Sequence, residues 1–525
     1  MFVAAQARWS AQDIFLFVGA FGAMGHHLPG MIRAYGDKAL FQRFRMRFVV
    51  APVVLIAVCV WSSVYNIQAI QLVALVWGIW HGMMQTYGFS RIYDGKARAK
   101  APQRARLDFA LCLTWFTTAV VLSPLRFRSC LDLYYDSGGP VIPSWLVNGF
   151  RSGAFLILSV VTVLYAVGQW RDWRAGRGFS PIKLALLASS IGFWWYCNNG
   201  VQNILVGIAL FEVFHDVQYL SIVWIYNRAR VERDETIRGF MRFVFRRSGS
   251  LLGVYVGLVF AYGAIALLTS GVSAEAIRYT LVGMVTASAL LHFYYDGFIW
   301  KVRETQTGSM LGLNSERSPT APQVRRLPPW SGHALRWAAL LVPFGALCGA
   351  QLLGRTVPAI ERSARVAEVL PQDGKAQLAY GKALQDAGRL DDAIGRLETA
   401  VRLKPDLAEA EFCLGLALSD RGDLTQSVPH YERALELDPK NAKTEVNLAG
   451  VLRVLRRPSE SRARYEHSLA LDPKLELAHK ELADLLLEAG EYDNAIAHYE
   501  EALRLQPAFP EAVDGLRFAR SFTGR

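Results

Sequence analysis

Residues 201–226 read VQNILVGIALFEVFHDVQYLSIVWIY, a mostly apolar run with a few polar side chains near its middle. An α-helix of about 20 apolar residues is long enough to cross the hydrocarbon core of a bilayer. The central polar side chains are Glu212, His215, Asp216 and Tyr219. Because an ionisable group inside a membrane is costly, its presence there indicates a function. This stretch therefore predicts a transmembrane helix that carries part of a functional site.

Similar runs recur on both sides of this stretch. The chain has 525 residues, of which 52% are hydrophobic and 19% charged, so it is more apolar than an ordinary soluble protein. We expect about ten transmembrane helices, near residues 13–32, 47–65, 70–88, 107–125, 146–168, 182–198, 201–226, 250–270, 279–300 and 334–353. The first run is not typical of a cleaved signal peptide, because no basic segment precedes it and further spans follow.

Basic residues are unevenly distributed between alternate loops. The loops after odd-numbered spans carry nearly all the Lys and Arg of this region, whereas the opposite loops carry only Arg126, Arg128 and Arg278. By the positive-inside rule, the N-terminus and the C-terminal region lie outside the cytoplasm, which means the periplasm for a bacterial inner-membrane protein. The formal net charge of +12 then reflects contact with membrane lipids. We therefore expect no nucleic acid as a partner.

A different pattern begins after residue 353, where the apolar runs stop. Prolines at 371, 405, 439, 473 and 507 recur with a period of 34 residues. Small residues keep the same register at Gly381, Gly415, Ala449 and Ala483. Glycines for a turn follow at Gly388, Gly422 and Gly490, and large side chains at Leu397, Tyr431, Tyr465 and Tyr499. The regular spacing predicts a repeat protein built from helix pairs.

This region resembles the tetratricopeptide repeat family in its period, its small residues and its turn glycines. The resemblance implies four stacked helix pairs, a capping helix after Pro507 and a surface that binds a protein partner. One repeat departs from the family pattern, because Arg456 stands where the turn glycine is expected and Pro458 follows. We expect the corner between the two helices to be altered there.

Together these patterns predict an all-α protein. A polytopic transmembrane helix bundle of about ten helices occupies residues 1–355, and a linker or leading helix occupies residues 356–370. An α-solenoid of four tetratricopeptide-type repeats with a capping helix occupies residues 371–525.

Histidines are concentrated in the odd-numbered spans, at His26, His27, His81, His215 and His292. Each lies about 6 to 13 residues before the first basic residue of the following loop, which corresponds to about 10 to 20 Å along a helix. Because these spans run in the same direction, the imidazoles share one depth. We expect four helices to bring them together in the cytoplasmic half of the bilayer.

Polar side chains stand within one helical turn of these histidines, at Gln85, Glu212, Tyr219 and Asp296. Imidazoles and carboxylates without cysteine suit a transition metal, and we take iron as the first candidate, with copper, zinc or manganese as alternatives. A haem held by paired histidines is a further alternative. The predicted metal ligands are His26, His27, His81, Glu212, His215 and His292. The predicted catalytic residues are Gln85, Asp216, Tyr219 and Asp296.

The leading interpretation is a metal-dependent integral membrane oxidoreductase of the oxygenase or hydroxylase type. It would act on a lipid-like or hydrophobic substrate, while the repeats recruit a protein partner. One alternative is a metal-free transferase or assembly factor in which histidine and aspartate serve as base and orienting group. Another is a membrane-anchored scaffold in which the histidines are structural.

Overall fold

The computed structural model describes residues 8–19, 24–96, 102–176, 180–235, 237–246, 250–268, 272–299, 331–354 and 357–523. These residues form helices joined by turns and loops, and no strand occurs among them. The predicted all-α class is confirmed. The chain divides into two compact units, Met1–Val357 and Pro358–Arg525, and each is described by itself.

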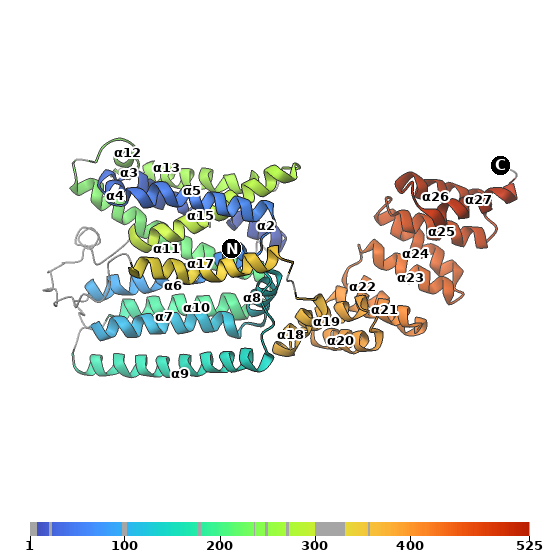
Figure 1. Cartoon of the computed structure of the whole chain (residues 1–525), viewed down its shortest axis with the longest axis horizontal. Helices are drawn as coiled ribbons and strands as arrows, with labels where there is room; N and C mark the ends of the chain where they lie inside the picture. The colour runs from blue at the N-terminus through green and yellow to red at the C-terminus, as the bar shows by residue number, and fades with distance from the viewer. Residues whose placement is uncertain are drawn as a thin grey trace. The chain divides into compact units, whose positions relative to one another are not determined.

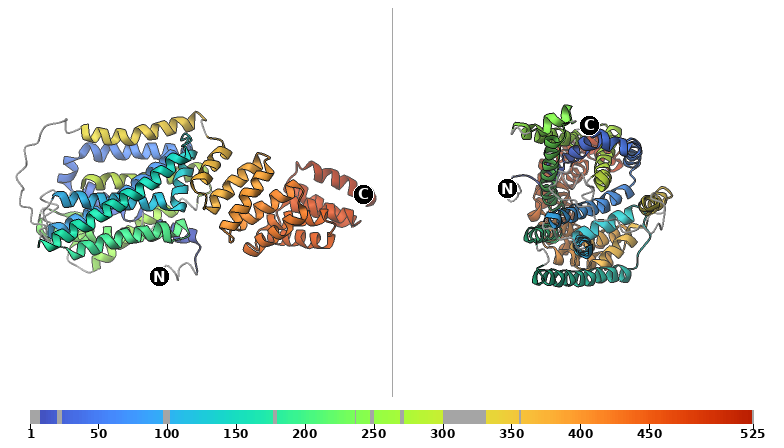
Figure 2. Two further views of the ribbon diagram at one scale, coloured as in Figure 1. Left: turned by 90° about the horizontal axis from the view of Figure 1, so that it is seen from below. Right: turned by 90° about the vertical axis from the view of Figure 1, so that its left-hand side faces the viewer.

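Long helices running in roughly the same direction make up most of the first unit (Figures 1 and 2). Before the midpoint of this unit the elements are α2 (Ala11–Val18), α3 (His27–Gly36), α4 (Lys38–Arg43), α5 (Arg45–Val64), α6 (Ala69–Lys96), α7 (Pro102–Leu122), α8 (Pro124–Asp136) and α9 (Ser144–Arg174). They are followed by α10 (Pro181–Trp195), the π-helix η2 (Tyr196–Gly200), α11 (Ile204–Arg233), α12 (Gly239–Phe245), α13 (Ser250–Ala264), the short 3₁₀-helix η3 (Ile265–Leu267), α15 (Glu275–Ile299) and α17 (Ser331–Leu352).

Five of the described helices are both long enough and apolar enough to cross a membrane. They are α5, α9, α11, α15 and the part of α7 from Arg104 to Leu122. Gly253–Ala264 and Leu341–Leu352 are apolar but shorter. The outward side chains of α9 include Leu156 and Val163, as expected of a helix that faces lipid. These criteria support a membrane protein but do not confirm the expected number of about ten spans.

The first predicted span, residues 13–32, contains two described α-helices. α2 ends at Val18 and α3 begins at His27, while residues 20–23 lie outside the described part of the chain. Pro29 then falls in the first turn of α3, where its missing N–H is not needed. His26 is the N-cap residue of α3.

The second unit consists of helix pairs, as the repeat pattern predicts. α18 (Ala359–Val369) precedes four pairs and a last helix: α19 (Gly374–Asp386), α20 (Leu390–Leu403), α21 (Ala408–Arg421), α22 (Leu424–Leu437), α23 (Ala442–Val454), α24 (Pro458–Leu471), α25 (Glu476–Glu488), α26 (Tyr492–Leu505) and α27 (Pro510–Thr523). A Cβ atom on Gly381 would lie 2.7 Å from Leu397, which explains why this repeat has glycine where its helices cross.

The corner at Arg456 keeps the turn geometry of the other repeats. Arg456 has φ 61°, close to the 73° of Gly388 and the 78° of Gly490. A side chain in this left-handed conformation costs about 1 kcal/mol or more relative to glycine. The expected change in the corner is therefore absent, and the repeat keeps its geometry at the cost of backbone strain.

Replacing Arg456→Gly should stabilise the α23–α24 pair. The side chain is exposed, so its removal costs few contacts, and the relief of strain exceeds the added entropy of the unfolded chain by about 0.5 to 1 kcal/mol. Hydrogen–deuterium exchange of the full chain should show slower exchange in α23 and α24. Arg456→Ala, which keeps the strain, is the control and should exchange like the wild type. Equal protection in both variants would contradict the strain at this residue.

Within a repeat, one pair of polar residues links the first helix to the second, and the same two positions recur 34 residues further along the chain. Glu411 and His430 lie 2.8 Å apart, and Glu445 and Arg464 lie 3.2 Å apart. In the last repeat the acid is replaced, so that Nδ1 of His479 lies 3.0 Å from Nδ1 of His498. Two imidazoles thus occupy a place where the two preceding repeats pair an acid with a base.

Acidification should loosen the last repeat. Burial and the neighbouring His479 lower the pKa of His498 in the folded chain. As the pH falls, the unfolded chain therefore binds a proton at a higher pH than the folded chain does. The free energy of unfolding is therefore greatest above about pH 6.5 and decreases as the pH falls towards the lowered folded pKa. Protection factors in α25 and α26, corrected for intrinsic exchange, should fall several-fold over this range. In His479→Glu the fall should disappear, because a carboxylate then pairs with protonated His498; a fall of equal size would contradict the prediction.

Candidate metal centre

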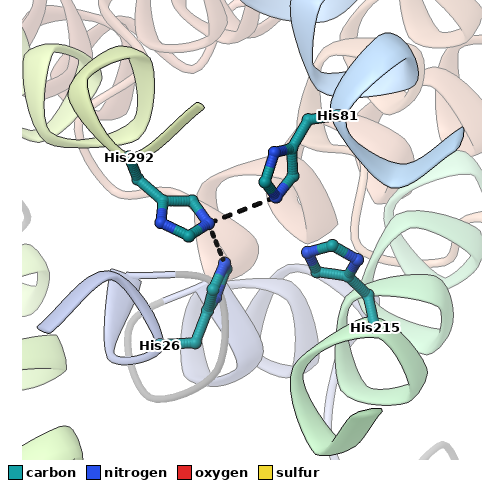
Figure 3. Close-up of side chains that lie close together, drawn as sticks. All are labelled: His26, His81, His215 and His292. Carbon is teal, nitrogen blue, oxygen red and sulfur yellow. Dashed lines mark hydrogen bonds between the residues drawn. The ribbon is translucent and has the colours of Figure 1, made fainter. Parts of the chain in front are cut away.

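Four histidines from four separate elements meet inside the first unit (Figure 3). Their positions are His26 immediately before α3, His81 in α6, His215 in α11 and His292 in α15. One ring nitrogen of each lies within 4.8 Å of the corresponding nitrogens of the others, and all four side chains are buried. The structure thus brings together four of the six predicted metal ligands.

The shortest contacts in the cluster converge on His292. Its Nε2 atom lies 3.1 Å from Nε2 of His26 and 3.2 Å from Nε2 of His81. Each imidazole nitrogen can either donate or accept a single hydrogen bond in the plane of the ring. Without a metal, Nε2 of His292 can therefore form a good hydrogen bond with only one of these two neighbours. Four nitrogens bound tetrahedrally at about 2.0 to 2.1 Å from an ion are about 3.3 Å apart. The two spacings around His292, 3.1 and 3.2 Å, therefore match those of ligands that share one metal ion.

Asp216 contacts the His26 imidazole on the side of the ring that faces away from the cluster. Its carboxylate lies 2.7 Å from Nδ1 of His26, and both side chains are buried. A histidine that binds a metal through one ring nitrogen commonly donates the N–H of the other to a carboxylate. Asp216 thus contacts Nδ1 of His26, while Nε2 of His26 faces His292 in the cluster.

Asp296 borders the cluster on the α15 side. One of its carboxylate oxygens lies 3.6 Å from Nε2 of His292 and 3.9 Å from Nε2 of His81, beyond hydrogen-bonding distance. The other accepts a 3.0 Å hydrogen bond from the hydroxyl of Tyr219. A Cβ atom on Gly30 would lie 3.1 Å from that hydroxyl, so glycine allows α3 to approach this pair.

The remaining predicted residues lie around the four histidines. Nδ1 of His27 is 3.0 Å from Oγ of Ser288, and the His27 ring stacks on His292 with centroids 4.7 Å apart. The amide of Gln85 donates to the backbone oxygen of His215 at 3.1 Å, so it joins α6 to α11. Glu212 is partly buried one turn before His215 and is not one of the four.

Two residues near the site were not singled out from the sequence. Ser288 contacts His27 and also lies 2.9 Å from the hydroxyl of Tyr262, which links α15 to the α13 segment. Its only signal in the sequence is its position one turn before His292. Gly30 gives no signal at all, because the need for a small residue depends on which helix lies opposite.

Comparisons with known proteins concern the second unit. A tetratricopeptide repeat family model matches residues 361–442, and a TPR repeat model matches residues 483–513. The C-terminal region therefore resembles the tetratricopeptide repeat family, as predicted from the sequence, and neither match extends into the membrane region. No curated protein matches the chain.

Solved structures similar to this chain include those of MamA and YrrB. A crystal structure of MamA is 23% identical, with a TM-score of 0.28, and covers 30% of this chain and 94% of its own. Residues 41 to the end of MamA from Desulfovibrio magneticus RS-1 are 18% identical, with a TM-score of 0.28, covering 30% and 90%. YrrB, described as a TPR protein with an unusual peptide-binding site, is 15% identical, with a TM-score of 0.28, covering 36% and 98%.

Proposed function

We propose that the first unit is a metal-dependent integral membrane oxidoreductase that holds one transition-metal ion between His26, His81, His215 and His292. The observation that carries this proposal is the convergence of their ring nitrogens within 4.8 Å in a buried site. Imidazole ligands beside a carboxylate suit iron, manganese, copper or zinc, and we propose iron.

The surrounding residues have distinct proposed roles. Asp216 fixes the tautomer of His26, so that Nε2 keeps a lone pair for the ion. Asp296 lies close enough to His81 and His292 to act as a further ligand after a small movement, and Tyr219 orients its carboxylate. A bound ion would supply redox or Lewis-acid chemistry at this position.

Burial of the site favours a substrate that comes from the membrane rather than from water. The four histidines are between 1% and 7% exposed. We therefore propose a hydrophobic or lipid-like substrate. We also propose that the repeats recruit a protein partner outside the cytoplasm, because the basic residues of the membrane region cluster in loops on one side.

Metal analysis of the purified full-length protein tests the function. We expect about one iron ion per chain and an absorption spectrum that changes on reduction, without the intense band of a haem. If the protein instead holds a redox-inactive ion such as zinc and shows no spectral change, the proposed oxidoreductase activity is overturned, whereas the proposed metal site stands. Absence of any transition metal, even after titration with ferrous, zinc and copper salts, would overturn both and favour the metal-free alternative.

A further inference from the structure

An apolar groove of about 440 Å³ lies between α5, α6, α15 and α17. Its walls include Val54 and Val58 of α5, Trp77 of α6, Leu290 of α15, and Leu341 and Phe344 of α17. The outer rim is open, because Val54 is 51% and Leu341 52% exposed. In a helix bundle that crosses a membrane, such an opening faces hydrocarbon chains.

The length of the groove matches one leaflet of a bilayer. Along α5 its lining extends from Met46 to Val58, which corresponds to about 18 Å at 1.5 Å per residue. Half of a hydrocarbon core about 30 Å thick is about 15 Å. One extended acyl chain therefore has the right length to occupy it.

One end of the groove carries a positive charge. Arg47 lines this end, with its guanidinium 5.3 Å from the ring centre of Phe44 and 5.1 Å from that of Phe298. Among the described residues, no carboxylate forms an ion pair with Arg47. A guanidinium held against aromatic rings at a membrane surface binds phosphate well, since it offers several N–H donors.

We propose that the groove binds one acyl chain of an anionic phospholipid, with the phosphate at Arg47. This inference goes beyond the proposed function, since it requires no metal. The groove and the histidine cluster share α6 and α15. On α15 they use different faces, because Leu290 and Tyr294 line the groove, whereas His292 belongs to the cluster. A variant in one site can therefore be examined without removing a ligand of the other.

Photolabelling of the full-length protein in nanodiscs tests the proposal. Phosphatidylglycerol with a diazirine in its acyl chain should label peptides of α5 and α17, and phosphatidylcholine with the same chain should label them less. Val54→Trp fills the groove and should reduce labelling by about fivefold or more. The matched control is Val160→Trp, at an outward position of α9, which should leave it unchanged. Leu341→Trp repeats the test from the opposite wall.

The charged end is tested by a second pair of variants. Arg47→Gln should abolish the preference for phosphatidylglycerol, whereas Arg45→Gln, on the same helix but exposed, should keep it. Equal labelling by the two lipids in the wild type, or equal effects of Val54→Trp and Val160→Trp, would overturn the proposal. So would crosslinks between two chains at the groove, which would indicate a second copy as its occupant. Metal content of the same samples reports separately on the proposed function.

Discussion

In His292→Ala protein, the metal content should fall from about one ion per chain to less than about a tenth. His292 holds the central position, because its Nε2 atom lies 3.1 Å from Nε2 of His26 and 3.2 Å from Nε2 of His81. Its ring is 1% exposed, so the cavity left by alanine lies deep in the protein. The affinity for the ion should decrease by about 100-fold or more, since changes behind a metal ligand already cost 10- to 100-fold. Metal analysis and competition with a chelator measure the two quantities.

His27→Ala is the matched control for this result. His27 is the neighbour of His26 in the sequence and stacks on His292, yet it contacts Ser288 rather than joining the four. We expect this variant to keep its metal. The metal content of Asp216→Asn should lie between those of the two other variants, because this change weakens the contact that orients His26 without removing a ligand. Equal losses in His27→Ala and His292→Ala would point to a general loss of structure, and full retention in His292→Ala would exclude it as a ligand.

The repeats were the most predictable part of the fold. Every repeat contains its own pattern of small, large and turn residues, so the sequence indicates both the helices and the contact between them. Arg456 shows the limit of this reasoning, because the sequence reveals a missing glycine but not whether the backbone still adopts a positive φ. That outcome depends on the packing of the neighbouring helices, which overrides the preference of a single residue.

The membrane region was less predictable, because hydropathy averages over a window. It does not predict that α3 begins at His27, inside the expected span of residues 13–32. It also leaves the number of spans unconfirmed: α6 is long and carries His81, but among the described helices it does not meet the length and hydropathy criteria that α5 and α15 meet.

The grouping of the histidines was predictable from the sequence, but its detail was not. The sequence predicts that the histidines share one layer, and the structure brings His26, His81, His215 and His292 together. The sequence could not distinguish His26 from His27, because adjacent residues differ only in the direction they face. In the structure His26 is the N-cap residue of α3 and its ring contacts His292, whereas His27 begins the helix and its Nδ1 contacts Ser288.

A buried cluster of charges also escaped sequence analysis, since Lys183 looked like one more basic loop residue. Its Nζ atom lies 3.0 Å from Asp94 and 2.7 Å from Asp108, and all three side chains are at most 3% exposed. Arg91 contacts both carboxylates, so the charges balance. This cluster joins α10 to α6 and α7. Helix α6 also carries His81.

Replacing Lys183→Met should therefore destabilise the first unit strongly. Methionine has a similar volume but no charge, so two buried carboxylates share the single cation Arg91. Removing one partner of a buried ion pair costs about 3 to 5 kcal/mol. Unfolding of the full-length protein in mixed micelles of increasing SDS content should show the loss as a lower midpoint. The double variant Lys183→Met with Asp108→Asn restores the balance of charge and should regain part of the stability. If the single variant unfolds like the wild type, or the double variant is no more stable than the single one, these charges do not hold α10 in place.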